Sequence, residues 1–215
     1  MYETIVFDLD GTLLDTLEDL ANATNAALTF CGLPLRTVEE VRAFVGNGAK
    51  KLIERAVGEG NQHLTEKALR AFKEYYGAHC ADKTAPYEGI LPLLCTLQDL
   101  GVKTAVLSNK PDFAVKSLAE RYFGGLLQEA VGENEAAGIR KKPAPDALFT
   151  VMAGLSADPK TTVYVGDSEV DIQTAKNAGV DCICVTWGFR DKAFLQEQGG
   201  DRFVDSPAEL LDFIN

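Results

Sequence analysis

Short apolar runs that end in polar residues recur along the chain, and they predict buried strands. The first run, residues 4–7, is rich in β-branched and aromatic side chains and stops at acidic residues and a glycine. Further runs of this kind cover residues 103–107, 129–131, 162–165, 182–186 and 202–204. Helical patterns separate most of these runs. The alternation predicts an α/β fold, with a Rossmann-like parallel sheet that carries helices on both faces.

One interval breaks the alternation, because residues 16–83 show helical periodicity and no convincing strand. The pattern predicts helices over residues 17–30, 38–44, 49–57 and 65–79, separated by glycines and a proline. Thr37 and Glu40, three residues apart, have the spacing of a capping box at the start of the second helix. We therefore expect an inserted all-helical domain at 16–83 and a sheet domain made of 1–15 and 84–215.

The charge of the chain narrows the classes of partner. The 215 residues include 21 Lys and Arg against 32 Asp and Glu, which gives a formal net charge of -11. Such a surface repels nucleic acids and acidic membranes. The insert holds nine basic and nine acidic residues, so the whole deficit belongs to the sheet domain.

Two further features indicate a cytoplasmic protein. The apolar run at the amino terminus is interrupted by Asp8 and Asp10, so it has the pattern of neither a signal peptide nor a membrane anchor. The five cysteines form an odd set without a CxxC pair, which fits a reducing compartment better than a disulfide framework.

Acidic residues come directly after the first predicted strand. Asp8 and Asp10 are two residues apart, so the strand period of two points both carboxylates to the same side of the chain. Two like charges in one place require a cation, and Mg²⁺ is typically held by one or two carboxylates together with phosphate oxygens of a substrate. Gly11 and Thr12 then supply a turn whose backbone amides are expected to face an anion.

Three later polar clusters also stand at or near predicted strand ends. Ser108 and Asn109 precede a helix and suit phosphate binding, Lys142 offers a cation, and Asp167 and Asp171 offer two more carboxylates. Taken singly, each cluster is better explained as a helix cap, a turn or a solvated face. Together they converge on one edge of a parallel sheet, where ligands bind in folds of this class.

With these clusters in place, the chain resembles the haloacid dehalogenase superfamily of phosphatases. The matching motifs are DLDGTLLD at 8–15, SN at 108–109, KP at 142–143 and GDSEVD at 166–171, in the order found in that family and across almost the whole chain. Within the superfamily, the insert and the stretches FVGNGAKKLIERAVG, LSNKP and KKPAPDAL are most similar to bacterial phosphoglycolate phosphatases.

The resemblance implies a role for each acid. Asp8 attacks phosphorus and forms an aspartyl-phosphate, while Asp10 protonates the leaving oxygen and later activates water. Asp8, the backbone carbonyl of Asp10 and the side chain of Asp167 hold Mg²⁺. Asp171 either ligates the ion or supports one of its ligands or a bound water.

The resemblance also assigns the residues that hold the substrate. Ser108, Asn109 and Lys142, with the turn at Gly11, clamp the phosphoryl oxygens; Lys142 is preferred to Lys141 because it directly precedes the proline of the motif. The insert corresponds to a helical cap that selects the leaving group. Within it, the residues expected to contact a substrate carboxylate are Gly46, Asn47, Gly48 and Lys51. The alternative for these four is a helix-start turn and then a solvated basic face.

The expected substrate is a small phosphorylated metabolite, with 2-phosphoglycolate preferred. A sugar-phosphate phosphatase, a pyrophosphatase or a phosphomutase would share the same core site, and a phosphonate hydrolase would need a Schiff-base lysine such as Lys50 or Lys51. A signalling module that accepts phosphate on an aspartate is an alternative from another class, but it needs neither an insert nor a leaving-group acid. Monomer and dimer are both compatible with the sequence. The motif Trp187-Gly188-Phe189 is interpreted as a structural turn at a strand end.

Overall fold

The computed structural model describes residues 1–214 and divides the chain into two compact units. The sheet unit consists of Met1–Leu14 and the chain from Pro86 onward, and the helical unit consists of Asp15–Ala85. The chain passes between the units at β2 (Leu14–Asp15) and β3 (Ala85–Pro86), which pair as a two-stranded sheet. None of the helices described within residues 1–214 is long and apolar enough to cross a membrane.

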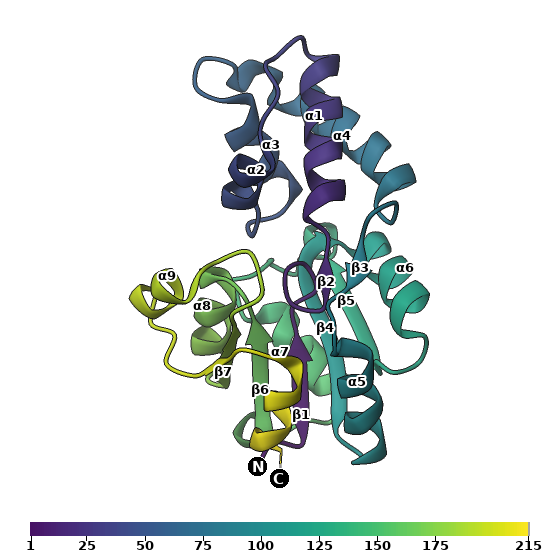
Figure 1. The fold of residues 1–215 in the computed structure, drawn as a ribbon, viewed down its shortest axis with the longest axis vertical. Helices are drawn as coiled ribbons and strands as arrows, with labels where there is room; N and C mark the ends of the chain where they lie inside the picture. The colour runs from purple at the N-terminus through teal and green to yellow at the C-terminus, as the bar shows by residue number, and fades with distance from the viewer. Residues whose placement is uncertain (215) are drawn as a thin grey trace. The chain divides into compact units, whose positions relative to one another are not determined.

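A six-stranded sheet, parallel throughout, forms the centre of the sheet unit, with the strand order β5-β4-β1-β6-β7-β8 (Figure 1). Its strands are β1 (Thr4–Phe7), β4 (Lys103–Pro111), β5 (Glu129–Glu133), β6 (Thr162–Gly166), β7 (Asp181–Val185) and β8 (Phe203–Val204). Phe7 lies opposite Val106 of β4 and Val165 of β6, so the three strands run to one edge of the sheet. The residues at the carboxyl ends of these strands are therefore brought to the same place.

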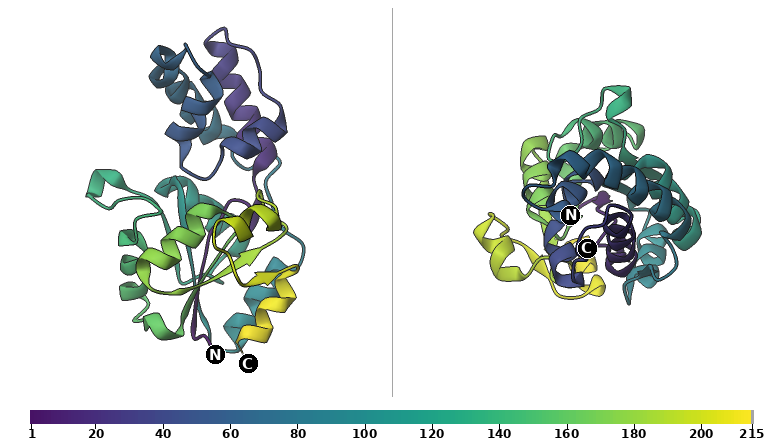
Figure 2. Two further views of the ribbon diagram at one scale, coloured as in Figure 1. Left: turned by 90° about the vertical axis from the view of Figure 1, so that its left-hand side faces the viewer. Right: turned by 90° about the horizontal axis from the view of Figure 1, so that it is seen from above.

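Helices lie on both faces of this sheet, which confirms the predicted fold class (Figure 2, left). The helices of the unit are α5 (Ile90–Asp99), α6 (Asp112–Phe123), α7 (Asp146–Gly154), α8 (Glu169–Ala178) and α9 (Lys192–Glu197), with short turns η2 (Glu135–Ala137), η3 (Pro159–Thr161) and η4 (Pro207–Phe213). On the face covered by α7, Val6, Leu107 and Tyr164 of the sheet pack with Leu148 and Met152. Alternate residues such as Ile5 and Val163 are also buried, which a sheet covered on both faces requires.

Strand β4 extends four residues beyond the predicted 103–107. The register with β5 shifts between Leu107 and Pro111, so the polar end of β4 is a bulged segment. The apolar run stops at Leu107, and the pairing that continues the strand comes from β5, which a local pattern does not show. Pro111 is the N-cap of α6.

The helical unit contains α1 (Leu17–Phe30), α2 (Val38–Phe44), α3 (Ala49–Val57) and α4 (Thr65–His79), with a short turn η1 (Gln62–Leu64) before the last helix. All four helices have the predicted bounds. The capping box is confirmed, because Glu40 N–H donates to Thr37 Oγ1 (3.2 Å) and Thr37 N–H donates to Glu40 Oε2 (2.8 Å). The α1 and α4 helices pack side by side through buried faces that include Leu28 and Phe72.

A buried carboxylate ties the two ends of the helical unit together. Asp19, in the first turn of α1, is 2% exposed. Its Oδ2 accepts hydrogen bonds from Lys83 N–H (3.0 Å), Thr84 N–H (2.8 Å) and Thr84 Oγ1 (2.8 Å). The last residues of the helical unit, at Lys83 and Thr84, are thereby fixed to its first helix, α1.

Asp19→Ala is expected to destabilise the protein by about 2–4 kcal/mol, because it leaves several buried donors unsatisfied at once. Glu18→Ala is the matched control, since the Glu18 side chain is 61% exposed and lies 3.9 Å from the Lys83 ammonium. Denaturant unfolding measures both changes, and amide exchange at Lys83 and Thr84 locates the first. Equal, small effects of the two substitutions would contradict this role for Asp19.

Candidate active site

The polar residues expected at the strand ends do meet at one edge of the sheet. Asp8 comes directly after β1, Ser108 lies in the bulged end of β4, and Asp167 comes directly after β6. Asp171 lies in the first turn of α8, and Lys142 precedes α7. All five side chains belong to the sheet unit and are buried.

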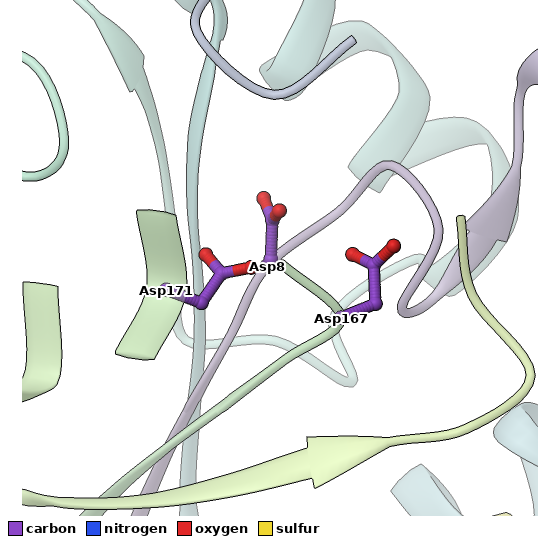
Figure 3. Close-up of side chains that lie close together, drawn as sticks. All are labelled: Asp8, Asp167 and Asp171. Atoms are coloured by element: carbon purple, nitrogen blue, oxygen red, sulfur yellow. The ribbon is translucent and has the colours of Figure 1, made fainter. Parts of the chain in front are cut away.

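Three carboxylates form the centre of the site. Asp8, Asp167 and Asp171 each contribute one oxygen to a set of atoms that all lie within 4.8 Å of one another. Figure 3 shows the three side chains beside one another beyond β1 and β6. Three acids this close in a buried place require positive charge to remain ionised.

Lys142 supplies one positive charge. Its Nζ lies 2.9 Å from Asp8 Oδ1 and 2.8 Å from Asp171 Oδ1, and it donates to Tyr164 Oη at 2.9 Å. Burial alone would lower the pKa of Lys142, but the negative charges of Asp171 and Asp8 raise it well above its usual value. The side chain of the neighbouring Lys141 is 33% exposed and lies 3.9 Å from Glu135. The structure therefore brings Lys142, and not Lys141, to the acids.

The phenol of Tyr164 positions the lysine. This side chain is fully buried in β6, and its hydroxyl donates to the carbonyl of Leu107 in β4 at 2.8 Å. Asn109 adds a second fixing point, since its Nδ2 donates to the backbone carbonyl of Lys142 at 3.0 Å. Tyr164 was not predicted as a site residue, because its apolar surroundings in the run 162–165 are typical of a core residue.

The electrostatics of the acids favour an added cation. Burial raises the pKa of Asp8 to about 7, opposed by the Lys142 ammonium and reinforced by the charges of Asp171 and Asp10. Burial also raises the pKa of Asp167, and the charges of Asp171 and Asp8 add to the effect. Three carboxylates and one ammonium carry a net charge of -2. An oxygen-rich set with this charge fits a hard divalent ion such as Mg²⁺.

Asp167 is held by two loops. Its Oδ1 accepts from the Thr12 hydroxyl (3.2 Å), and its Oδ2 accepts from Phe189 N–H (2.7 Å). Trp187 Nε1 donates to the carbonyl of Thr12 at 3.0 Å, which joins the two loops. The turn interpreted from sequence as merely structural thus contacts the acid cluster through its backbone.

Gly11 contributes by lacking a side chain. It has φ +83, and a Cβ there would overlap the carboxylate of Asp167. Its N–H, which was expected to face an anion, donates to the carbonyl of Leu14 at 2.9 Å in this structure. The observed contribution of Gly11 is this close approach, and phosphate binding at its turn stays a prediction.

Asp171 has partners for both of its oxygens. Lys142 contacts Oδ1, while Ser168 donates to Oδ2 through its N–H (3.0 Å) and its hydroxyl (2.6 Å). Of the two roles expected for Asp171, this arrangement favours support of the site over direct coordination of an ion.

Asp10 and Asp8 form ion pairs with different lysines. Asp10 Oδ1 lies 2.9 Å from Lys110 Nζ, and their side chains are 13% and 3% exposed. Strand β1 ends at Phe7, so the two-residue alternation assumed for the two acids does not extend to them. Lys110 was not predicted as a site residue; its place directly after Ser108 and Asn109 was the available signal.

The residues expected to recognise a substrate carboxylate make contacts within the helical unit. Gly48 is the N-cap of α3, and Asn47 Oδ1 accepts from Arg55 at 2.8 Å. Lys51 pairs with Glu54 at 2.9 Å on an exposed surface. Substrate contact by these residues and by Gly46 stays a prediction, as does the role of the unit as a cap.

Comparisons with known proteins agree with the sheet and its motifs. Phosphoglycolate phosphatase of Pseudomonas syringae pv. syringae is 37% identical over 96% of this chain and 78% of its own length, and that of Chromobacterium violaceum is 34% identical over 99% and 96%. A crystal structure of a putative phosphoglycolate phosphatase from Lactobacillus delbrueckii subsp. bulgaricus matches with a TM-score of 0.93 and 40% identity, covering 97% of this chain and 96% of that one. CbbY from Rhodobacter sphaeroides, solved in complex with phosphate, matches with a TM-score of 0.79 and 28% identity, covering 98% and 96%.

The family is established by this agreement across the chain. A sequence model of haloacid dehalogenase-like hydrolases matches residues 5–185, which include the motifs at 8–15, 108–109, 142–143 and 166–171. Over that range the structure brings Asp8, Lys142 and Asp167 into one buried cluster. The chain belongs to the haloacid dehalogenase-like hydrolases.

Proposed function

We propose that this protein is a Mg²⁺-dependent phosphatase that hydrolyses small phosphomonoesters through an aspartyl-phosphate, with 2-phosphoglycolate as the preferred substrate. The observation that carries the proposal is the Lys142 ammonium held between Asp8 and Asp171 at the ends of parallel strands. The names of the curated relatives support the substrate. The cysteine pattern favours a cytoplasmic setting.

Asp8 is the nucleophile in this mechanism. Leu9 N–H (2.7 Å) and Lys142 Nζ (2.9 Å) both contact its Oδ1, which leaves Oδ2 to attack phosphorus. The attack forms a bond between Oδ2 and phosphorus and breaks the bond to the leaving oxygen. Lys142 then lies beside the phosphorylated carboxyl, where it stabilises negative charge on the phosphoryl oxygens.

Asp10 exchanges the proton. Its carboxyl gives a proton to the leaving oxygen during the first transfer and takes one from the attacking water during the second, so it ends in its starting form. The charge of Asp10 acts on Asp8, which is consistent with a place beside the reacting group.

Asp8 and Asp167 are the side chains that would hold Mg²⁺, together with the backbone carbonyl of Asp10, and Asp171 would support them. When bound, the ion supplies charge neutralisation to the acids and polarises a phosphoryl oxygen. Ser108, Asn109 and Lys142 would contact the remaining oxygens.

The helical unit is assigned the choice of leaving group, as a cap. The turn before α3 contains Gly46, Asn47 and Gly48, and both glycines have a positive φ. Lys51 in the helix adds positive charge, and a turn of this kind at the start of a helix suits a carboxylate.

A panel of phosphorylated metabolites, assayed with Mg²⁺, tests the proposal. We expect the highest kcat/KM for 2-phosphoglycolate and none for the transfer of phosphate between sugar hydroxyls. Preference for a sugar phosphate or pyrophosphate would overturn the substrate. Stable phosphorylation without turnover of any ester would point to a signalling module and overturn the enzyme class.

Asp8→Asn is expected to lower kcat by more than about 1,000-fold, because the amide keeps the shape of the side chain but is a poor nucleophile. Acid quenching with a radiolabelled substrate should trap a phosphoenzyme in the unmodified protein and none in the variant. Substantial turnover by Asp8→Asn would contradict covalent catalysis.

Lys142→Ala is expected to lower kcat/KM by about 100-fold or more, since it removes the ammonium from the developing charge. Lys141→Ala, its neighbour on the surface, should stay within about twofold of the unmodified protein. Lys142→Arg restores a charge if the alanine variant folds poorly. The opposite ranking of the two alanine variants would move the phosphate contact to Lys141.

The stability of the metal-free protein is expected to fall as pH rises from about 4 to about 7, because the folded state holds protons on Asp8 and Asp167 that the unfolded state releases. Mg²⁺ competes with those protons, so it should raise the Tm more at about pH 8 than at about pH 5. Thermal melting with and without Mg²⁺ at both pH values measures the rise in Tm. Asp167→Asn is the control, in which this rise should be lost. A Mg²⁺ effect independent of pH would contradict coordination by these acids.

A further inference from the structure

A second buried lysine stands at the edge of the site. Lys110 is 5% exposed as a residue, and its Nζ lies 2.9 Å from Asp10 Oδ1. Lysine is rarely buried to this degree unless it is paired. Burying it costs solvation and side-chain entropy, so its position beside Asp10 is specified by the fold.

The local backbone shows how the fold specifies that position. From Leu107 to Pro111 strand β4 advances four residues, while β5 advances two, from Val131 to Glu133. A bulge of this kind redirects the side chains of the strand that carries it. The redirected segment contains Ser108 and Asn109 as well as Lys110.

Gly132 of β5 permits the bulge. A Cβ at this position would stand 2.6 Å from the carbonyl oxygen of Lys110 and would overlap the backbone of Asp112. Gly132 N–H donates to Asp112 Oδ1 at 3.0 Å, which fixes the start of α6 directly after the bulge. The backbone of Lys110 is therefore held from the strand beside it and from the helix after it.

We propose that Lys110 is a positioning residue for proton transfer: its ammonium orients the Asp10 carboxyl toward the leaving oxygen. The inference rests on the proposed function, in which Asp10 exchanges that proton. The exchanged proton is carried by the Asp10 carboxyl, whose Oδ1 lies 2.9 Å from the Lys110 ammonium. It moves to the leaving oxygen as the phosphorus–oxygen bond breaks and is replaced from water in the second step. Lys110 keeps its own protons throughout.

The nature of the leaving group separates this role from a structural one. Glycolate leaves as an alkoxide and needs a proton in the transition state, whereas 4-nitrophenolate is stable enough to leave without one. The ratio kcat/KM covers the first phosphoryl transfer. A misplaced Asp10 therefore lowers kcat/KM for 2-phosphoglycolate and spares 4-nitrophenyl phosphate.

The experiment compares Lys110→Met with Lys110→Arg in the Mg²⁺-loaded full chain. Lys110→Met should lower kcat/KM about 100-fold for 2-phosphoglycolate and less than about threefold for 4-nitrophenyl phosphate, and Lys110→Arg should recover about tenfold of the loss. Lys116→Met is the control, because Lys116 also pairs with an aspartate, Asp112, at 2.7 Å, but its side chain is 63% exposed. This substitution should leave kcat/KM unchanged for both esters. Both esters are measured on one preparation, so the fraction of folded protein cancels in their ratio.

Two results would overturn the inference. An equal loss on both esters would mean that Lys110 serves the structure or the phosphoryl group. A loss with 2-phosphoglycolate but not with ethyl phosphate, an alkyl ester without a carboxylate, would mean that Lys110 binds the substrate directly.

Asp10→Asn separates the inference from the proposed function. Suppose that Asp10→Asn lowers kcat/KM more for 2-phosphoglycolate than for 4-nitrophenyl phosphate and that Lys110→Met does not. The inference then fails, and the role of Asp10 stands. If Asp10→Asn lowers kcat/KM equally for the two esters, the proposed function of Asp10 fails, and the inference fails with it. The inference is supported if each single variant lowers kcat/KM selectively for 2-phosphoglycolate and the double variant lowers it by less than the product of the two single losses.

Discussion

The Lys142 ammonium is the contact on which the arrangement of the site depends. It lies within 2.9 Å of both Asp8 and Asp171, in a buried place where these acids and Asp167 would otherwise repel one another. Removing one partner from such a cluster leaves uncompensated charge, which costs far more than an exposed pair does. Tyr164 of β6 and Asn109 of β4 hold the lysine, so one charged group links the ends of the two strands that flank β1.

The cluster remains short of positive charge even with Lys142 in place, and this shortage connects stability with function. Burial raises the pKa of Asp8 to about 7, so the metal-free fold favours a proton where the proposed mechanism needs a carboxylate. In that mechanism a divalent cation would remove the conflict and reverse the local sign, so that an anionic phosphoryl group could approach an acidic protein. Asp10 lies beside a different ammonium, that of Lys110, 2.9 Å from its Oδ1.

How far the sequence predicts this structure depends on how local each interaction is. The helices of the helical unit were predicted to their bounds because caps and apolar periodicity act within a few residues, as at Thr37. Asp8 and Asp167 were predicted from their place after apolar strands. The pair of Asp10 with Lys110 and the hydrogen bond from Phe189 N–H to Asp167 were missed, because they join segments distant in sequence and depend on a bulge or a backbone donor.

A crystal structure grown with Mg²⁺ and beryllofluoride, a mimic of the phosphoryl group on aspartate, tests the central claim most directly. We expect beryllium bonded to Asp8 Oδ2, Mg²⁺ between Asp8 and Asp167, and the Lys142 ammonium beside a fluorine. Asp171 should keep its contacts with Lys142 and Ser168. Beryllofluoride bound at another residue, or Lys142 turned away from Asp8, would contradict the central role given to this lysine.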